Sequence, residues 1–60
     1  MIKLTKFNGS VFVLNEDLIE YMEETPDTII TLSNDKKLII EEGIDEVIEK
    51  IIKHKRKIHI

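Results

Sequence analysis

The chain has 60 residues, of which 42% are apolar and 35% are charged, with two glycines, one proline, no cysteine and a net charge of −3. This length corresponds to one small domain, residues 1–60, which buries only about 60% of its unfolded surface. The composition excludes collagen-like and disordered chains, and the lack of cysteine excludes disulfides and thiolate metal sites. The chain is also too short for a nucleotide-binding unit followed by a substrate domain.

The charge is divided unevenly along the chain. Residues 1–49 hold all 12 acidic residues and four lysines, whereas residues 50–60 hold five basic residues and no acid. A nucleic-acid-binding domain usually has a broad basic excess, which this chain lacks. No apolar run approaches the ~20 residues that span a bilayer, and Lys3 and Lys6 interrupt the N-terminal apolar stretch that a signal peptide would need. We therefore expect a cytoplasmic protein.

The first predicted element is a β-hairpin over residues 2–14. Asn8-Gly9 is the strongest short hairpin signal, because a type I′ turn needs φ above zero at both of its central residues. A two-residue turn at this position predicts a register that pairs Thr5 with Phe12, Leu4 with Val13 and Lys3 with Leu14.

Residues 18–25 are compatible with two structures. Alternating apolar and acidic residues favour a strand, whereas a short helix started by Asn15 would turn Leu18, Ile19 and Met22 inward. We favour the strand, because Pro26-Asp27 suits a type I turn and a β-branched run follows it.

Two more strands are expected before the end of the sheet region. The β-branched run over residues 28–32 predicts one strand, and residues 37–41 predict the last. Residues 33–36 between them predict a tight turn, since Asn34 and Asp35 both tolerate the left-handed backbone conformation.

Residues 44–59 have the periodicity of a helix. Their apolar positions form one stripe about 140° wide, made of Ile44, Val47, Ile48, Ile51, Ile52 and Ile58. Gly43 is an acceptable N-cap, and acidic residues near the start with basic residues near the end complement the helix dipole. Lys55 lies within the stripe. Either the helix leaves the sheet after Ile52, or the aliphatic part of the Lys55 side chain packs along the apolar surface and its amine reaches water.

Together these elements predict an α+β domain. It consists of a small antiparallel meander of about five short strands over residues 2–41, with one C-terminal α-helix on one face. Open strand edges and two isoleucine-rich faces also predict self-association as a homo-oligomer.

No pattern in the sequence indicates a catalytic, cofactor or metal site. His54 and His59 would point about 140° apart on a helix, so one monomer cannot bring both to one metal, and we expect both to be exposed at the helix end. The carboxylates occur mainly as sequence neighbours, and we expect them on the solvated surface. No glycine-rich phosphate loop is present. We expect no enzymatic activity, no cofactor and no metal.

The most suggestive feature is a basic cluster near the end of the chain, made of Lys53, Lys55, Arg56 and Lys57. Such a cluster can contact RNA, an anionic lipid surface or an acidic protein, or it can only balance the helix dipole. RNA binding would be helped by exposed aromatic residues, but the chain has only three and Phe12 is expected in the core.

Several blocks of the sequence, in order and over nearly the whole chain, match the pattern of one family: Ile2-Lys3-Leu4-Thr5-Lys6-Phe7-Asn8-Gly9, Val13-Leu14-Asn15, Ile19-Glu20, Thr25-Pro26-Asp27-Thr28-Ile29-Ile30-Thr31-Leu32, Glu46-Val47-Ile48-Glu49-Lys50-Ile51-Ile52 and Lys55-Arg56-Lys57-Ile58. On these blocks the chain resembles the small flagellar FlbD family, also called SwrD or swarming motility protein. Two departures are conservative. Asn34-Asp35 stand where the family usually has a glycine, and Gly43 stands where a Ser-like residue often starts the helix.

The resemblance implies a cytoplasmic accessory of the bacterial flagellum that supports motor power and swarming. It brings no catalytic residues and implies action by binding, with the cytoplasmic side of the MotA/MotB stator or its assembly path as the partner. We expect Lys53, Lys55, Arg56 and Lys57 to contact an acidic protein or the inner face of the membrane.

The alternative is a small RNA-binding regulator that resembles the carbon-storage regulators. Those proteins are of similar length, rich in strands and end in a helix. An RNA binder should carry basic residues on its strands. Because the strands predicted here carry mostly acids between their apolar residues, we do not expect nucleic acid as the partner.

Overall fold

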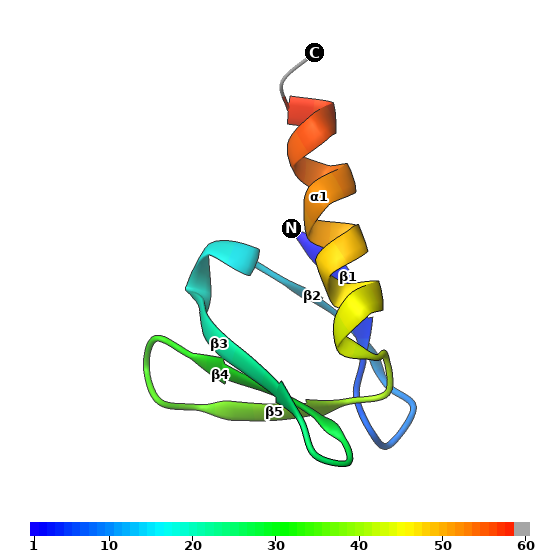
Figure 1. The fold of residues 1–60 in the computed structure, drawn as a ribbon, viewed down its shortest axis with the longest axis vertical. Helices are drawn as coiled ribbons and strands as arrows, with labels where there is room; N and C mark the ends of the chain where they lie inside the picture. The colour runs from blue at the N-terminus through cyan, green and yellow to red at the C-terminus, as the bar shows by residue number, and fades with distance from the viewer. Residues whose placement is uncertain (59–60) are drawn as a thin grey trace.

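The computed structural model describes the backbone of residues 1–58 and the side chains of residues 1–55. It confirms the α+β class, with five short antiparallel strands and one C-terminal helix. Figure 1 shows the elements in chain order: β1 (Ile2–Thr5), β2 (Val11–Leu14), the 3₁₀ turn η1 (Glu16–Leu18), β3 (Ile19–Glu24), β4 (Thr28–Leu32), β5 (Lys37–Ile40) and α1 (Ile44–Ile58).

The strands form two small sheets that meet at one point. β1 pairs with β2, and β3, β4 and β5 pair in that order. An isolated antiparallel bridge between Lys6 and Ile40 joins the two sheets. Beside it, Phe7 N–H donates to Ile39 O at 3.2 Å, and Glu41 N–H donates to Thr5 O at 2.9 Å. The end of β1 is therefore fixed to the end of β5.

The first hairpin forms over the predicted residues, but the predicted register is wrong by one residue. Leu4 lies opposite Phe12, and Thr5 lies opposite Val11. Lys6 N–H donates to Ser10 O at 2.8 Å, and Gly9 N–H donates to Lys6 O at 2.9 Å. The connection is therefore a three-residue loop with a bulge at its end.

Only one residue of this loop needs an unusual backbone. Gly9 has φ +92°, whereas Asn8 does not have a positive φ. The Asn8 side chain instead accepts a hydrogen bond from Ser10 N–H at 3.0 Å. A type I′ turn is excluded, and the extra loop residue shifts the register by one.

The segment that the sequence left open contains both structures in succession. Asn15 caps η1, and its side chain accepts a hydrogen bond from Asp17 N–H at 3.0 Å. The single 3₁₀ turn then ends and β3 begins at Ile19. The strand that the sequence favoured is confirmed, and the helix reduces to the three residues of η1.

The two connections within the second sheet have different conformations. Between β4 and β5, Asp35 has φ +69° and its N–H donates to Leu32 O at 2.9 Å, which repeats the pattern of the first hairpin. Between β3 and β4, Thr25 N–H donates to Asp27 O at 3.2 Å, and the Thr25–Pro26 peptide is cis. The type I turn expected at Pro26-Asp27 is therefore wrong.

The core lies where the two sheets and the helix meet. Its buried apolar residues come from β1, β2, β4, β5 and α1: Ile2, Leu4, Leu14, Ile30, Leu32, Ile40 and Val47. Phe12 is partly buried and packs against this cluster, as do Met22 and Ile51. A residue from α1 at the centre explains why the helix is part of the fold and not an appendage.

The helix begins as predicted, but a distant side chain caps it. Val47 N–H donates to Gly43 O at 3.1 Å, which closes the first turn. Gly43 has no side chain that could accept the next free N–H group. Glu24, from the end of β3, accepts a hydrogen bond from Ile44 N–H at 3.1 Å and supplies the missing cap.

The apolar stripe of α1 is only partly covered. Val47 is buried and Ile44 and Ile51 are half-buried, but Ile48 and Ile52 are exposed. In Figure 1 the C-terminal half of α1 extends beyond both sheets. Lys55 is exposed, which both alternatives for this residue allow, and the half-buried His54 shows that α1 still contacts the rest of the domain beyond Ile52. Two isoleucines of the predicted stripe are therefore left uncovered by the sheets.

Candidate functional surface

The predicted basic cluster falls on the part of α1 that extends away from the sheets. Lys53 and Lys55 are both exposed. The side chains of Arg56 and Lys57 lie outside the described residues. Two further basic groups join this surface through the fold, because β1 passes beside α1: Lys50 from the helix and Lys3 from the strand.

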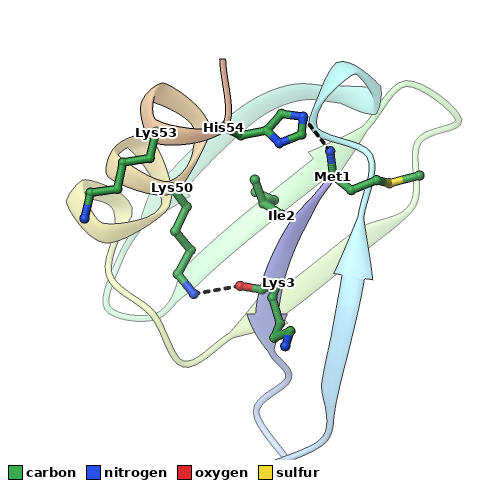
Figure 2. Close-up of a pocket in the computed structure, with 6 residues that line it drawn as sticks. All are labelled: Met1, Ile2, Lys3, Lys50, Lys53 and His54. Carbon is green, nitrogen blue, oxygen red and sulfur yellow. Dashed lines mark hydrogen bonds between the residues drawn. The ribbon is translucent and has the colours of Figure 1, made fainter. Parts of the chain in front are cut away.

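A shallow pocket of about 260 Å³ lies between the start of β1 and the middle of α1. Its lining contains Lys3, Lys50, Lys53 and His54, with the buried Ile2 side chain between the two elements. Figure 2 shows that the amino groups of Lys3, Lys50 and Lys53 point in different directions. These amino groups therefore do not converge on a single small anion.

Lys50 is held in place within the protein. Its Nζ donates to Lys3 O at 2.7 Å and lies 3.9 Å from Glu42 Oε2. Among the described residues no ion pair engages Lys3, Lys53 or Lys55. Of the lysines beside this pocket, these three have amino groups that no described ion pair engages.

His54 does not have the exposed position expected from the sequence. It is half-buried, and its Nε2 lies 3.0 Å from the Met1 amine and 3.2 Å from Glu16 Oε2. Glu16 Oε1 also accepts a hydrogen bond from the Met1 amine at 2.8 Å. These contacts fasten the C-terminal half of α1 to η1 and to the residue before β1. His59 lies outside the described residues.

Two carboxylates are not on the solvated surface, contrary to expectation. The Glu16 side chain is 7% exposed and the Glu42 side chain is 10% exposed. Glu42 Oε1 accepts a hydrogen bond from Thr5 N–H at 3.0 Å, and Glu42 Oε2 accepts one from the Thr5 hydroxyl at 2.9 Å. Both acids join β1 to later parts of the chain.

The surroundings of these acids hold them in the charged form. The hydrogen bond from the Met1 amine is the main reason that the pKa of Glu16 lies below its ordinary value. Burial raises the pKa of Glu42, but hydrogen bonds, chiefly those from Thr5, outweigh it and leave the pKa lowered. Sequence patterns carry no sign of either site, because the partners lie far apart along the chain.

A second hollow of about 360 Å³ lies where the first hairpin loop meets β5. Its lining includes Lys6, Phe7, Lys37 and Ile39. Phe7 is 62% exposed, and Lys6 Nζ lies 5.6 Å from the centre of the Phe12 ring. This hollow combines an exposed aromatic ring with two lysines.

Among the described residues no group of three or more metal-binding side chains could hold an ion. No described helix has the length and apolar character needed to cross a membrane.

The fold is that of a small α+β domain with exposed lysines on its C-terminal helix. A family model described as FlbD, flagellar and swarming motility proteins, matches residues 1–59. The chain therefore belongs to the FlbD family, and the resemblance seen in the sequence is confirmed. No curated protein matches the chain, and no solved structure does.

Proposed function

We propose that the protein is a non-enzymatic flagellar accessory that raises the power of the motor for swarming. We propose further that it acts at the inner face of the membrane, by binding the cytoplasmic side of the MotA/MotB stator or a step in stator assembly. Membership of the flagellar and swarming motility family supports a role in flagellar motility. The exposed lysines of α1 support action by binding.

The observation that carries this proposal is the position of Lys53 and Lys55. Both are exposed on the C-terminal half of α1, and Lys53 lines the pocket beside the start of β1. Complementary charge steers two proteins together and fixes their orientation more than it raises affinity. An acidic cytoplasmic loop of a membrane protein is therefore a suitable partner for this surface.

The first experiment is a torque measurement on tethered cells of the motile host with this gene deleted, together with a count of flagella per cell. We expect torque to fall while the number of flagella is unchanged. A fall in flagellar number with unchanged torque per motor would contradict the proposal, because the protein would then act on flagellar gene expression or on assembly of the flagellum, and not on the stator.

The second experiment restores the gene with charge-reversed variants. We expect K53E/K55E, and separately R56E/K57E, to reduce torque strongly while circular dichroism shows an unchanged fold. The matched control is K36E, which reverses an exposed lysine beside the β4–β5 loop that lines neither of the two candidate surfaces. Wild-type torque with both helix variants would remove the helix surface from the mechanism. If the partner is lipid, the same variants will lose binding to vesicles with anionic headgroups.

RNA binding is the second candidate function, and the hollow beside Phe7 is the observation in its favour. An exposed ring between Lys6 and Lys37 can stack on a base while the lysines contact phosphates. The discriminating measurement is fluorescence anisotropy with single-stranded RNA. Binding that F7A removes and K53E/K55E leaves intact would favour this function over the stator.

A further inference from the structure

The inner edge of the first hairpin has its backbone groups engaged. Thr5 N–H donates to Glu42, Thr5 O accepts from Glu41 N–H, and Lys3 O accepts from the Lys50 amine. In an antiparallel pair, residues whose N–H and C=O groups point away from the partner strand alternate with residues that bond across it. Thr5 and Lys3 are therefore the residues of β1 that point their backbone groups away from β2.

The outer edge of the same hairpin has the opposite character. Val11 and Val13 lie opposite Thr5 and Lys3, so their backbone groups point away from β1. Among the described residues β2 pairs with no strand other than β1. The side chains of Val11 and Val13 are 62% and 60% exposed. β2 thus presents open backbone donors and acceptors between two exposed apolar side chains.

The outer edge of the other sheet is protected, which makes the contrast informative. β3 carries Glu20, Glu23 and Glu24 and has a register shift between Ile19 and Tyr21. Charges and bulges are the usual means by which an edge strand resists pairing with another chain. β2 has the sequence Val-Phe-Val-Leu and a regular ladder with β1. β3 is therefore protected against pairing with another chain, whereas β2 is open.

We propose that β2 is a dimerisation strand and that two copies of this chain pair antiparallel along it. A two-fold axis brings each strand against its own sequence, so a charged edge would face like charges. β2 has no charge and meets this requirement, whereas β3 does not. The second copy is therefore the occupant that the charge pattern of this edge fits.

The proposed register is the one in which both outward-facing residues of each β2 strand bond across the interface. The outward backbone groups of Val11 meet those of Val13 from the second copy, and the reverse pair follows by symmetry. Phe12 then lies at the axis, opposite Phe12 of the second copy. The two hairpins form one continuous sheet in which the exposed valines of both copies gather on one face. The strands are short, so we expect a weak dimer with a Kd in the micromolar range or above.

The first test is analytical ultracentrifugation over a range of protein concentrations, with variants checked for folding by circular dichroism. We expect a dimer for the wild type and monomers for V11K/V13K and for V11E/V13E alone, since like charges then face each other across the axis. A 1:1 mixture of the two variants should form a heterodimer, because each lysine then faces a glutamate. A heterodimer in this mixture would support pairing along β2 even where one variant alone is partly unfolded.

The second test uses the absence of cysteine from the sequence. Val11 and Val13 of opposite copies form a hydrogen-bonded pair, with Cα atoms about 5.5 Å apart. This distance allows a disulfide, which needs Cα atoms within about 7 Å. A mixture of V11C and V13C should therefore crosslink under mild oxidation, and V11C alone should crosslink much less, because its two copies are offset along the strands.

The proposal is overturned if the wild type stays monomeric at every concentration, or if V11K/V13K still dimerises. The second result would move the interface to another apolar surface, such as Ile48 and Ile52 on α1. Equal crosslinking of V11C alone and of the mixture would overturn the register. None of these variants touches the basic residues of α1, so this proposal can fail while the motor function stands.

Discussion

Glu42 accepts two hydrogen bonds from Thr5, one from its backbone N–H at 3.0 Å and one from its hydroxyl at 2.9 Å. The pair joins the first strand to the connection that leads into α1. Glu42 also lies 3.9 Å from the amine of Lys50, which itself bonds to the backbone of Lys3. One carboxylate therefore fixes the spacing between β1 and the helix that carries the candidate binding surface.

Replacement of Glu42 by alanine should destabilise the fold by about 1–3 kcal/mol, because the part-buried Thr5 donors lose their acceptor. The measurement is the midpoint and slope of urea unfolding, followed by circular dichroism. The matched control is E41A at the exposed neighbouring position, which should change the free energy of unfolding by no more than about 0.5 kcal/mol. Equal effects of the two variants would show that the Thr5 contacts do not stabilise the fold.

Stability should also depend on pH through these acids. Glu16 and Glu42 have pKa values below their ordinary value of 4.5 in the folded protein. The stability they contribute is present above that value, and it is lost as the pH falls below it toward their folded pKa values, since the unfolded chain then binds more protons. Urea unfolding between about pH 3 and pH 7 measures the slope. E42Q should reduce the slope of the unfolding free energy against pH. An unchanged slope would show that Glu42 does not contribute to the pH dependence.

The two bulged loops give a paired prediction. G9A should destabilise the fold by about 1–2 kcal/mol, because φ +92° is unfavourable for any residue with a Cβ atom. The open space around Gly9 leaves backbone strain as the cause, since no atom lies within 4 Å of an added Cβ. At the equivalent position of the other loop, D35G should be neutral or stabilising by up to about 1 kcal/mol, because Asp35 already has φ +69°. Thermal unfolding of both variants measures the two effects. If G9A stabilised the fold, the prediction would be contradicted.

The long-range cap on α1 can be tested at Glu24. E24A should cost about 0.5–2 kcal/mol, because Ile44 N–H loses its acceptor and Gly43 has no side chain to replace it. E23A, at the neighbouring exposed position on the opposite face of β3, serves as the control. Hydrogen exchange at the first turn of α1 is the direct readout. Unchanged exchange in E24A would mean that water caps this helix equally well.

The strands and the helix could be predicted because each depends on neighbouring residues. The β-branched run that forms β4 and the 3.6-residue period of α1 are local signals. The register of the first hairpin could not be predicted from Asn8-Gly9, since the same dipeptide suits a two-residue turn and a bulged three-residue loop. The difference between them depends on whether Asn8 takes positive φ in addition to Gly9.

The candidate surface was only partly predictable for a related reason. The charge cluster marked Lys53 and Lys55, because five basic residues in the last eleven are visible in the sequence alone. The roles of Glu16 and Glu42 were not visible. Each acid meets a partner that the fold, and not the spacing, brings near: Thr5 lies 37 residues from Glu42, and His54 lies on the far helix. A lone glutamate in a polar stretch gives no local sign of such a contact.

The hydrogen bonds of β1 have a consequence for the order of events during protein synthesis. β1 leaves the ribosome before the other strands of this domain, and its inner edge depends on Glu41, Glu42 and Lys50, which lie up to 47 residues later. Until those residues emerge, the β1–β2 hairpin has two bare edges instead of one. We therefore expect the nascent chain to stay unfolded through most of its translation and to close in a single late step, when the helix becomes available.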